Sequence, residues 1–213
     1  MDDIRIIAYR IIFCVLGWTS IIISLTMSYE YVIAGTSALD VYGNMFSYYT
    51  IQTNVIVATW FLLAILYAKK EEKPAFMGPI VRGAITLYIT VTFLGFAVLL
   101  SFLYKPTGIA AFTNLVSHYI VPIAVIIDWL VTGHDDEYEW KHIVYYLIYP
   151  SGYLIYCLIR GAFTGFYPYY FINPDMLGIP FLIIAIIVLV LVYVALGSMY
   201  IAINRKLYNK RNT

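Results

Sequence analysis

The stretch Phe112–Leu130 reads FTNLVSHYIVPIAVIIDWL. Its length and its apolar content predict a helix that crosses a bilayer. Its first half nevertheless contains Asn114, His118 and Pro122. Asn114 and His118 are four residues apart, so they share one face of the predicted helix. An ionisable ring inside a membrane is costly unless other groups bind it or use it. We therefore expect neighbouring helices to supply partners for His118.

The composition of the whole chain is typical of a multi-pass membrane protein. Of its 213 residues, 62% are hydrophobic and 12% are charged, which is about half the charged share of a soluble domain. The formal net charge of +1 indicates no nucleic-acid partner. Both cysteines, Cys14 and Cys157, lie inside apolar runs without metal-ligand spacing. We expect neither a metal nor a cofactor.

Apolar runs recur along the chain and predict an all-α fold: a bundle of six transmembrane helices in one domain over residues 1–213. The predicted helices cover about residues 6–29, 46–68, 79–103, 112–131, 142–161 and 178–203. Short polar loops rich in Gly, Pro, Asn and Asp separate them. The first run is too long for the apolar core of a signal peptide and lacks a cleavage site of small residues, so we interpret it as a retained helix.

Lysines and arginines predict the orientation in the membrane. With six helices, both termini lie on one side, and only Lys105 and Arg160 fall on the other side. The remaining eleven basic residues share the side of the termini: Arg5, Arg10, Lys69, Lys70, Lys73, Arg82, Lys141, Arg205, Lys206, Lys210 and Arg211. This asymmetry predicts that both termini are cytoplasmic.

This topology brings polar residues of several helices into the outer half of the bundle. The helix that starts near residue 46 carries Thr50, Gln52, Thr53 and Asn54 there. Counted from the predicted helix starts, Thr50 lies roughly 6 Å deep and His118 roughly 9 Å deep, at 1.5 Å per residue. Arg160 ends the fifth helix, and the aromatic, glycine-rich segment 161–171 follows it. We expect that segment to fold over the cluster as a lid.

Asp128 belongs to the opposite, inner boundary. It lies ten residues after His118, about 15 Å along the helix axis, and therefore cannot orient the His118 ring by direct contact. Arg82, at the inner start of the third helix, is the expected ion partner of Asp128. We expect this pair to have a structural role.

The outer residues suit acyl transfer. A threonine hydroxyl and a neutral imidazole act as nucleophile and general base when they lie within hydrogen-bond distance, so Thr50 and His118 form a candidate catalytic dyad. Thr53, on the same helix face, is the alternative nucleophile. A developing oxyanion needs hydrogen-bond donors. The candidate oxyanion or substrate-binding residues are Asn114, Asn54, Gln52 and Arg160.

The same residues also have structural interpretations. Membrane threonines commonly bond to their own preceding turn or join two helices, and Arg160 can extend to the outer boundary. Pro122 is expected to bend its helix and to free carbonyls near His118. Composition and spacing support an enzyme and a small transporter or proton-linked channel about equally, the latter with His118 and Arg160 as relay and selectivity groups. A non-catalytic membrane protein is the third interpretation.

An ordered set of motifs resembles a known family. The motifs are FSYYTIQTN from Phe46 to Asn54, NLVSHYIVP from Asn114 to Pro122, Arg160–Gly161, and GFYP from Gly165 to Pro168. They resemble bacterial relatives of the androgen-induced gene and androgen-dependent TFPI-regulating protein family. That resemblance implies a six-helix integral-membrane threonine hydrolase of fatty acid esters of hydroxy fatty acids, in a bacterial plasma membrane.

The resemblance also implies roles for particular residues. It matches Thr50 to the nucleophile and His118 to the base, and its lipid substrate arrives from the bilayer. A branched fatty ester carries a free carboxylate. Our hypothesis is that Arg160 binds this carboxylate near the outer surface while Thr50 attacks the ester below it.

Overall fold

The computed structural model is all-α and describes residues 4–70, 72–133 and 136–212. No strand occurs in these ranges. Six helical stretches are long and apolar enough to cross a membrane, as the sequence predicts. They are Ile4–Ile33, Tyr49–Leu66, Pro79–Leu100, Gly108–Thr132, His142–Thr164 and Pro174–Asn212. The chain is therefore an integral membrane protein with several spans.

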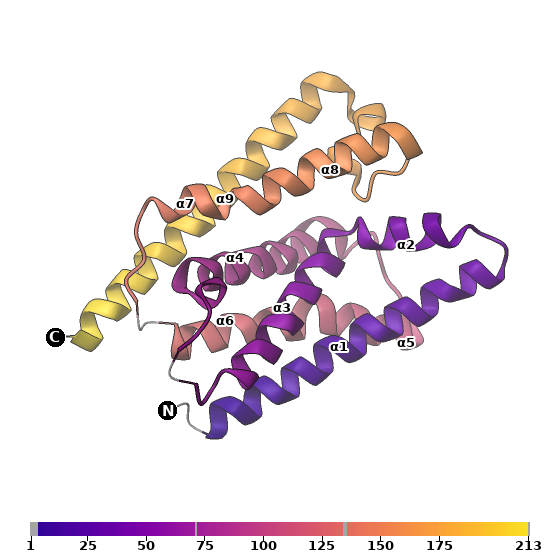
Figure 1. Cartoon of the computed structure of the whole chain (residues 1–213). Helices are drawn as coiled ribbons and strands as arrows, with labels where there is room; N and C mark the ends of the chain where they lie inside the picture. The colour runs from indigo at the N-terminus through magenta and orange to yellow at the C-terminus, as the bar shows by residue number, and fades with distance from the viewer. Residues whose placement is uncertain (1–3, 71, 134–135, 213) are drawn as a thin grey trace. The chain divides into compact units, whose positions relative to one another are not determined.

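The chain divides into two compact units, Met1–Gly133 and His134–Thr213. The first unit holds four of the candidate spans and the second unit holds two (Figure 1). The single domain over residues 1–213 stays a prediction.

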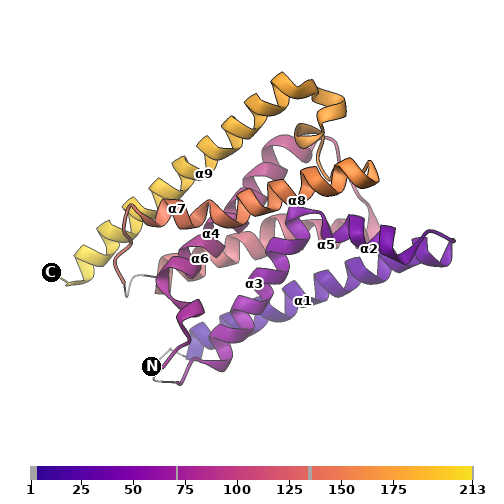
Figure 2. The ribbon, with the colours of Figure 1, turned by 45° about the horizontal axis from the view of Figure 1, so that its top comes forward.

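Helices of the first unit pack side by side. They are α1 (Ile4–Ile33), α2 (Ala38–Phe46), α3 (Tyr49–Leu66), the short η1 (Ala75–Met77), α4 (Pro79–Gly95), α5 (Gly108–Leu115) and α6 (Val121–Thr132). Helix α1 lies against α3, and α4 lies against α6 (Figures 1 and 2). A Cβ atom on Gly17 would lie 3.4 Å from the Ala58 methyl group, so small residues let α1 and α3 approach closely, as is usual between membrane helices.

Helix α3 begins later than predicted. The predicted start at Phe46 is wrong, because residues 38–46 form the separate helix α2 and the chain turns at Ser47 and Tyr48 before α3 starts at Tyr49. Thr50 therefore lies in the first turn of α3. This start also places Thr50 only one residue into its helix.

The helix that carries His118 begins earlier than predicted. Its first residue is Gly108, with φ of +59°, and not Phe112. His118 therefore lies ten residues from the helix start, about 15 Å at 1.5 Å per residue, and not 9 Å. Thr50 lies one residue into α3, and it contacts His118, which lies ten residues from the start of its own helix. The first residue of α3 must therefore lie deeper in the membrane than the first residue of α5.

Two wide turns interrupt the helices of the first unit. Helix α4 continues as the π-helical segment η2 (Phe96–Leu100), and α5 continues into α6 through the π-helical segment η3 (Val116–Ile120). In both, a backbone N–H donates to the carbonyl five residues earlier: Ser101 to Phe96, and Val121 to Val116. Such turns are rare and occur often at functional sites. The second one directly precedes Pro122, where the sequence predicts a bend.

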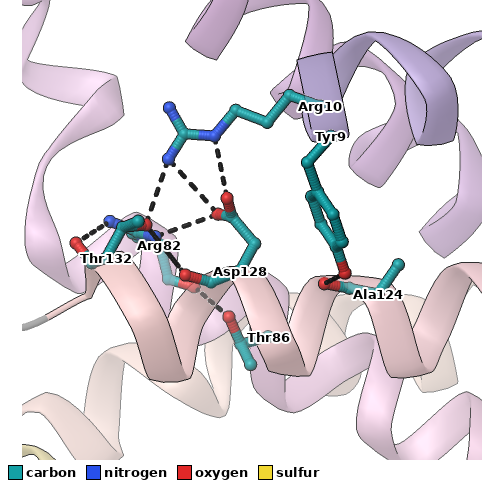
Figure 3. Close-up of polar contacts among 7 residues, drawn as sticks. All are labelled: Tyr9, Arg10, Arg82, Thr86, Ala124, Asp128 and Thr132. Atoms are coloured by element: carbon teal, nitrogen blue, oxygen red, sulfur yellow. Dashed lines mark hydrogen bonds and ion pairs between the residues drawn. The ribbon is translucent and has the colours of Figure 1, made fainter. Parts of the chain in front are cut away.

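The predicted ion pair between Arg82 and Asp128 is confirmed, with 2.9 Å between Arg82 Nη2 and Asp128 Oδ2. Sequence analysis missed a second partner: Arg10 Nε lies 2.8 Å from Asp128 Oδ1. Figure 3 shows both guanidinium groups converging on this carboxylate. The Arg10 and Asp128 side chains are only 7% and 4% exposed, so the cluster joins α1, α4 and α6 inside the unit.

Arg82 also caps the end of α6. Its Nη1 donates to the Thr132 carbonyl at 2.7 Å, and its Nη2 donates to the Asp128 carbonyl at 3.1 Å and to the Thr132 hydroxyl. The last carbonyls of a helix carry partial negative charge. They therefore balance the second positive charge of the cluster, and we assign the cluster a structural role.

The second unit contains α7 (His142–Tyr146), α8 (Ile148–Thr164), η4 (Tyr170–Ile172) and α9 (Pro174–Asn212). Asn204 on α9 is fully buried. Its Oδ1 accepts from the Tyr138 N–H at 2.7 Å, and its Nδ2 donates to the Asp136 carbonyl at 3.2 Å. Through these two hydrogen bonds, Asn204 holds the segment before α7 against α9. Gly178, with φ of +72°, kinks α9 near its beginning.

Candidate functional site

The structure brings Thr50 and His118 together. Thr50 Oγ1 lies 3.2 Å from His118 Nε2, within the range for a nucleophile and its general base. Thr50 belongs to α3 and His118 to the π-helical segment η3. Both residues are partly exposed.

The second ring nitrogen of His118 fixes the protonation pattern. His118 Nδ1 lies 3.1 Å from the backbone carbonyl oxygen of Asn114. A carbonyl oxygen only accepts hydrogen bonds, so Nδ1 carries the hydrogen of the neutral imidazole. Nε2 is then the unprotonated nitrogen and accepts from the Thr50 hydroxyl. This is the tautomer that a general base for Thr50 requires.

Phe96 covers one face of the imidazole. The ring centroids of Phe96 and His118 are 3.8 Å apart and the rings are 24° from parallel. Phe96 is buried and is the first residue of the other π-helical segment, η2. The two wide turns therefore meet at the candidate base, where the Phe96 ring stacks on one face of the imidazole. Sequence analysis missed Phe96, because a π turn has no local sequence signature that would have placed it there.

Thr53, the alternative nucleophile, is fully buried. Its hydroxyl oxygen lies 2.9 Å from the Tyr49 carbonyl oxygen and 2.8 Å from Thr92 Oγ1. It therefore bonds to the preceding turn of α3 and joins α3 to α4. These contacts match the structural interpretation of a membrane threonine.

The side-chain amides of Asn54 and Gln52 donate hydrogen bonds to backbone carbonyls. Asn54 Nδ2 donates to the Thr50 carbonyl at 2.8 Å and to the Ser117 carbonyl at 3.0 Å. An amide nitrogen has two hydrogens, so Asn54 has none left for an oxyanion in this arrangement. Gln52 Nε2 donates to the Phe46 carbonyl at 2.7 Å.

Asn114 differs from Asn54 and Gln52. Its Oδ1 is buried without a hydrogen-bond partner among the described residues. Because the oxygen and nitrogen ends of an amide are assigned from their partners, either end of Asn114 can face a ligand. Asn114 lies one turn before His118 on the same helix, so its amide is a donor available beside the dyad.

Arg160 lies in the second unit, near the end of α8. Its guanidinium carbon is 5.5 Å from the centroid of the Phe166 ring. A Cβ atom on Gly161 would lie 2.1 Å from the Tyr167 ring, so the segment after α8 folds back onto that helix. The roles of Arg160 in substrate binding and of this segment as a lid stay predictions.

No group of three or more His, Cys, Asp or Glu side chains is placed to hold a metal ion within the described ranges. Comparisons of the chain with known protein families, with curated proteins and with solved structures found no match. The family resemblance of the motifs therefore stays a prediction.

Proposed function

We propose that this protein is an integral-membrane hydrolase of lipid esters that uses Thr50 as nucleophile and His118 as general base. The observation that carries the proposal is the 3.2 Å contact between Thr50 Oγ1 and His118 Nε2, with His118 Nδ1 bound to a carbonyl. Thr53, the structural threonine of the same helix, bonds to the Tyr49 carbonyl and to another hydroxyl, that of Thr92. Thr50 instead directs its hydroxyl to a nitrogen that can accept its proton.

The reaction has two halves. In the first, Thr50 Oγ attacks the acyl carbon while His118 Nε2 takes the hydroxyl proton, and the Asn114 amide donates to the oxyanion. His118 then returns the proton to the leaving alcohol oxygen, and the acyl group remains as an ester of Thr50. In the second half, His118 takes a proton from water as the water oxygen attacks the acyl carbon of this ester. His118 then returns the proton to Thr50 Oγ as the acyl–oxygen bond breaks, which releases the carboxylic acid and restores the threonine hydroxyl.

A lipid ester is the substrate class that fits the surroundings. Large apolar side chains are exposed in the same part of the chain, including Phe46 at 42%, Phe112 at 38% and Leu115 at 49%. Such a surface suits hydrocarbon. Together with the motif resemblance, it favours fatty acid esters of hydroxy fatty acids as substrates and a bacterial plasma membrane as the location.

The test is ester hydrolysis by the purified protein in lipid nanodiscs, with a panel of fatty acid esters of hydroxy fatty acids. We expect Thr50→Ala and His118→Ala to lose turnover while Thr53→Ala, the matched control three residues along α3, keeps it. If Thr53→Ala loses turnover and Thr50→Ala keeps it, the nucleophile is Thr53, one helical turn further along α3. If the wild type hydrolyses none of the panel, the hydrolase proposal is rejected, and proton flux in liposomes then tests the transporter.

A further inference from the structure

Asn54 makes a double hydrogen bond in the first unit that the proposed reaction does not use. The Asn54 side chain is 2% exposed, and its Nδ2 joins the carbonyl of the nucleophile residue, Thr50, to the carbonyl of Ser117, which precedes His118. One amide group therefore joins the backbone of Thr50 to the backbone of the residue next to His118.

The Ser117 carbonyl is open because of the π turn and the proline. In η3 the N–H of Val121 donates to the carbonyl of Val116, five residues earlier. In the same register the next donor, to Ser117, would be residue 122. That residue is Pro122, which has no N–H. A buried carbonyl without a donor is costly, and Asn54 fills this position from another helix.

The bond also sets the spacing between the two helices. Asn54 stands one helical turn after Thr50 on α3, and Ser117 is adjacent to His118 in the chain. A shift of α3 along η3 that separated Thr50 from His118 would also have to break the 3.0 Å bond from Asn54 to Ser117. The Ser117 hydroxyl is held by Ser20 of α1, with 2.9 Å between the two oxygens.

We propose that Asn54 is a positioning residue that holds Thr50 at hydrogen-bond distance from His118. This inference rests on the proposed function. It assigns Asn54 no contact with substrate, since both amide hydrogens are used on carbonyls. Removing the amide should let the two helices slide, and a misplacement of about 1 Å between reacting groups costs about 10²-fold in rate.

The test distinguishes two roles of Asn54: holding Thr50 beside His118, and only supplying a hydrogen bond to the buried Ser117 carbonyl. Asn54→Leu removes both bonds, whereas Asn54→Leu with Pro122→Ala supplies an N–H for Ser117 within its own helix. We expect Asn54→Leu to lower kcat about 10²-fold with little change in KM. The double variant should regain thermal stability but not kcat. Recovery of both together, or full kcat in Asn54→Leu, would overturn the positioning role.

A second readout does not depend on turnover. The ¹⁵N resonance of His118 Nε2, assigned by its loss in His118→Gln, reports the bond from Thr50. Asn54→Leu should shift it as Thr50→Val does. If the wild type shows no hydrolysis but this shift occurs, the hydrolase proposal fails and the positioning role stands. An unchanged resonance in Asn54→Leu would reject the positioning role even in an active enzyme.

A milder variant covers the case in which Asn54→Leu does not fold. The hydroxyl of Asn54→Thr can donate to the Thr50 carbonyl one turn earlier but is too short to reach Ser117 on the other helix. We expect the same loss of kcat and the same shift of the His118 resonance. Wild-type values of both would overturn the proposal.

Discussion

Thr50 Oγ1 and His118 Nε2 lie 3.2 Å apart although 68 positions separate the two residues in the chain. The proposed reaction passes through an ester of Thr50. A lipid β-lactone that acylates nucleophilic hydroxyls should therefore label Thr50. His118→Gln should slow the labelling about 10²- to 10⁴-fold, because it removes the base. Peptide mass spectrometry identifies the labelled residue.

Thr53→Val is the control for this labelling and should be labelled at the wild-type rate. Labelling at Thr53 in the wild type would contradict the assignment of Thr50 as the nucleophile.

Asn114→Leu should separate activity from stability. As the proposed oxyanion donor, Asn114 should contribute about 10²- to 10³-fold to kcat. Its buried Oδ1 has no partner among the described residues, so replacing the amide by an apolar side chain of similar size should leave thermal stability unchanged or higher. Activity assays and thermal unfolding in the same nanodiscs check the two effects. Lower stability with wild-type kcat would indicate a structural residue instead.

Asp128→Asn should destabilise the first unit strongly. It leaves Arg10 and Arg82 in a buried cluster without their shared carboxylate, and breaking a buried ion pair costs about 3–5 kcal/mol. Glu137→Gln is the matched control: its pair with Arg205, at 3.0 Å, is about 40% exposed on both side chains, and such pairs contribute about 0–1 kcal/mol. Unfolding in detergent measures both. Equal losses would show that the Asp128 cluster is no more than a surface pair.

Gly161→Ala should disturb the segment that follows α8. The added Cβ would lie 2.1 Å from the Tyr167 ring, and overpacking of this kind costs about 1–3 kcal/mol. Gly152→Ala, in the same helix with open space around it, should be neutral or should stabilise by up to about 1 kcal/mol. Limited proteolysis of the segment should accelerate only in Gly161→Ala, and Tyr167→Ala should restore protection. Equal cleavage in both glycine variants would argue against this packing.

Arg160→Gln tests the proposed carboxylate site. The variant should weaken hydrolysis of esters that carry a free carboxylate and spare the corresponding methyl esters, because only the former offer an anion to the guanidinium. Lys105→Gln, which removes the other basic residue on the predicted outer side, is the control and should affect neither substrate. Equal effects of Arg160→Gln on both substrate forms would reject the role.

Several features were predictable from sequence alone. Apolar runs of membrane-spanning length predict the six spans, and the structure has six candidate spans. The cost of a charge in hydrocarbon predicts a partner for Asp128, and Arg82 is that partner. Helical spacing also puts Asn114 and His118 on one face. The spans and the shared helix face depend on residues close together in the chain, whereas the pair of Arg82 and Asp128, 46 positions apart, follows from the predicted topology that puts both at the inner boundary.

The tertiary structure decided which polar groups are used and which remain available. Asn54 and Asn114 are equivalent in sequence, as amides near the candidate dyad. The Asn54 amide donates both of its hydrogens to carbonyls, and one of these carbonyls lacks a donor in its own helix because of the π turn and Pro122. The buried Asn114 Oδ1 has no hydrogen-bond partner among the described residues. The second arginine on Asp128 and the Phe96 ring on His118 likewise depend on the register between helices. That register results from packing between distant segments, which no local pattern encodes.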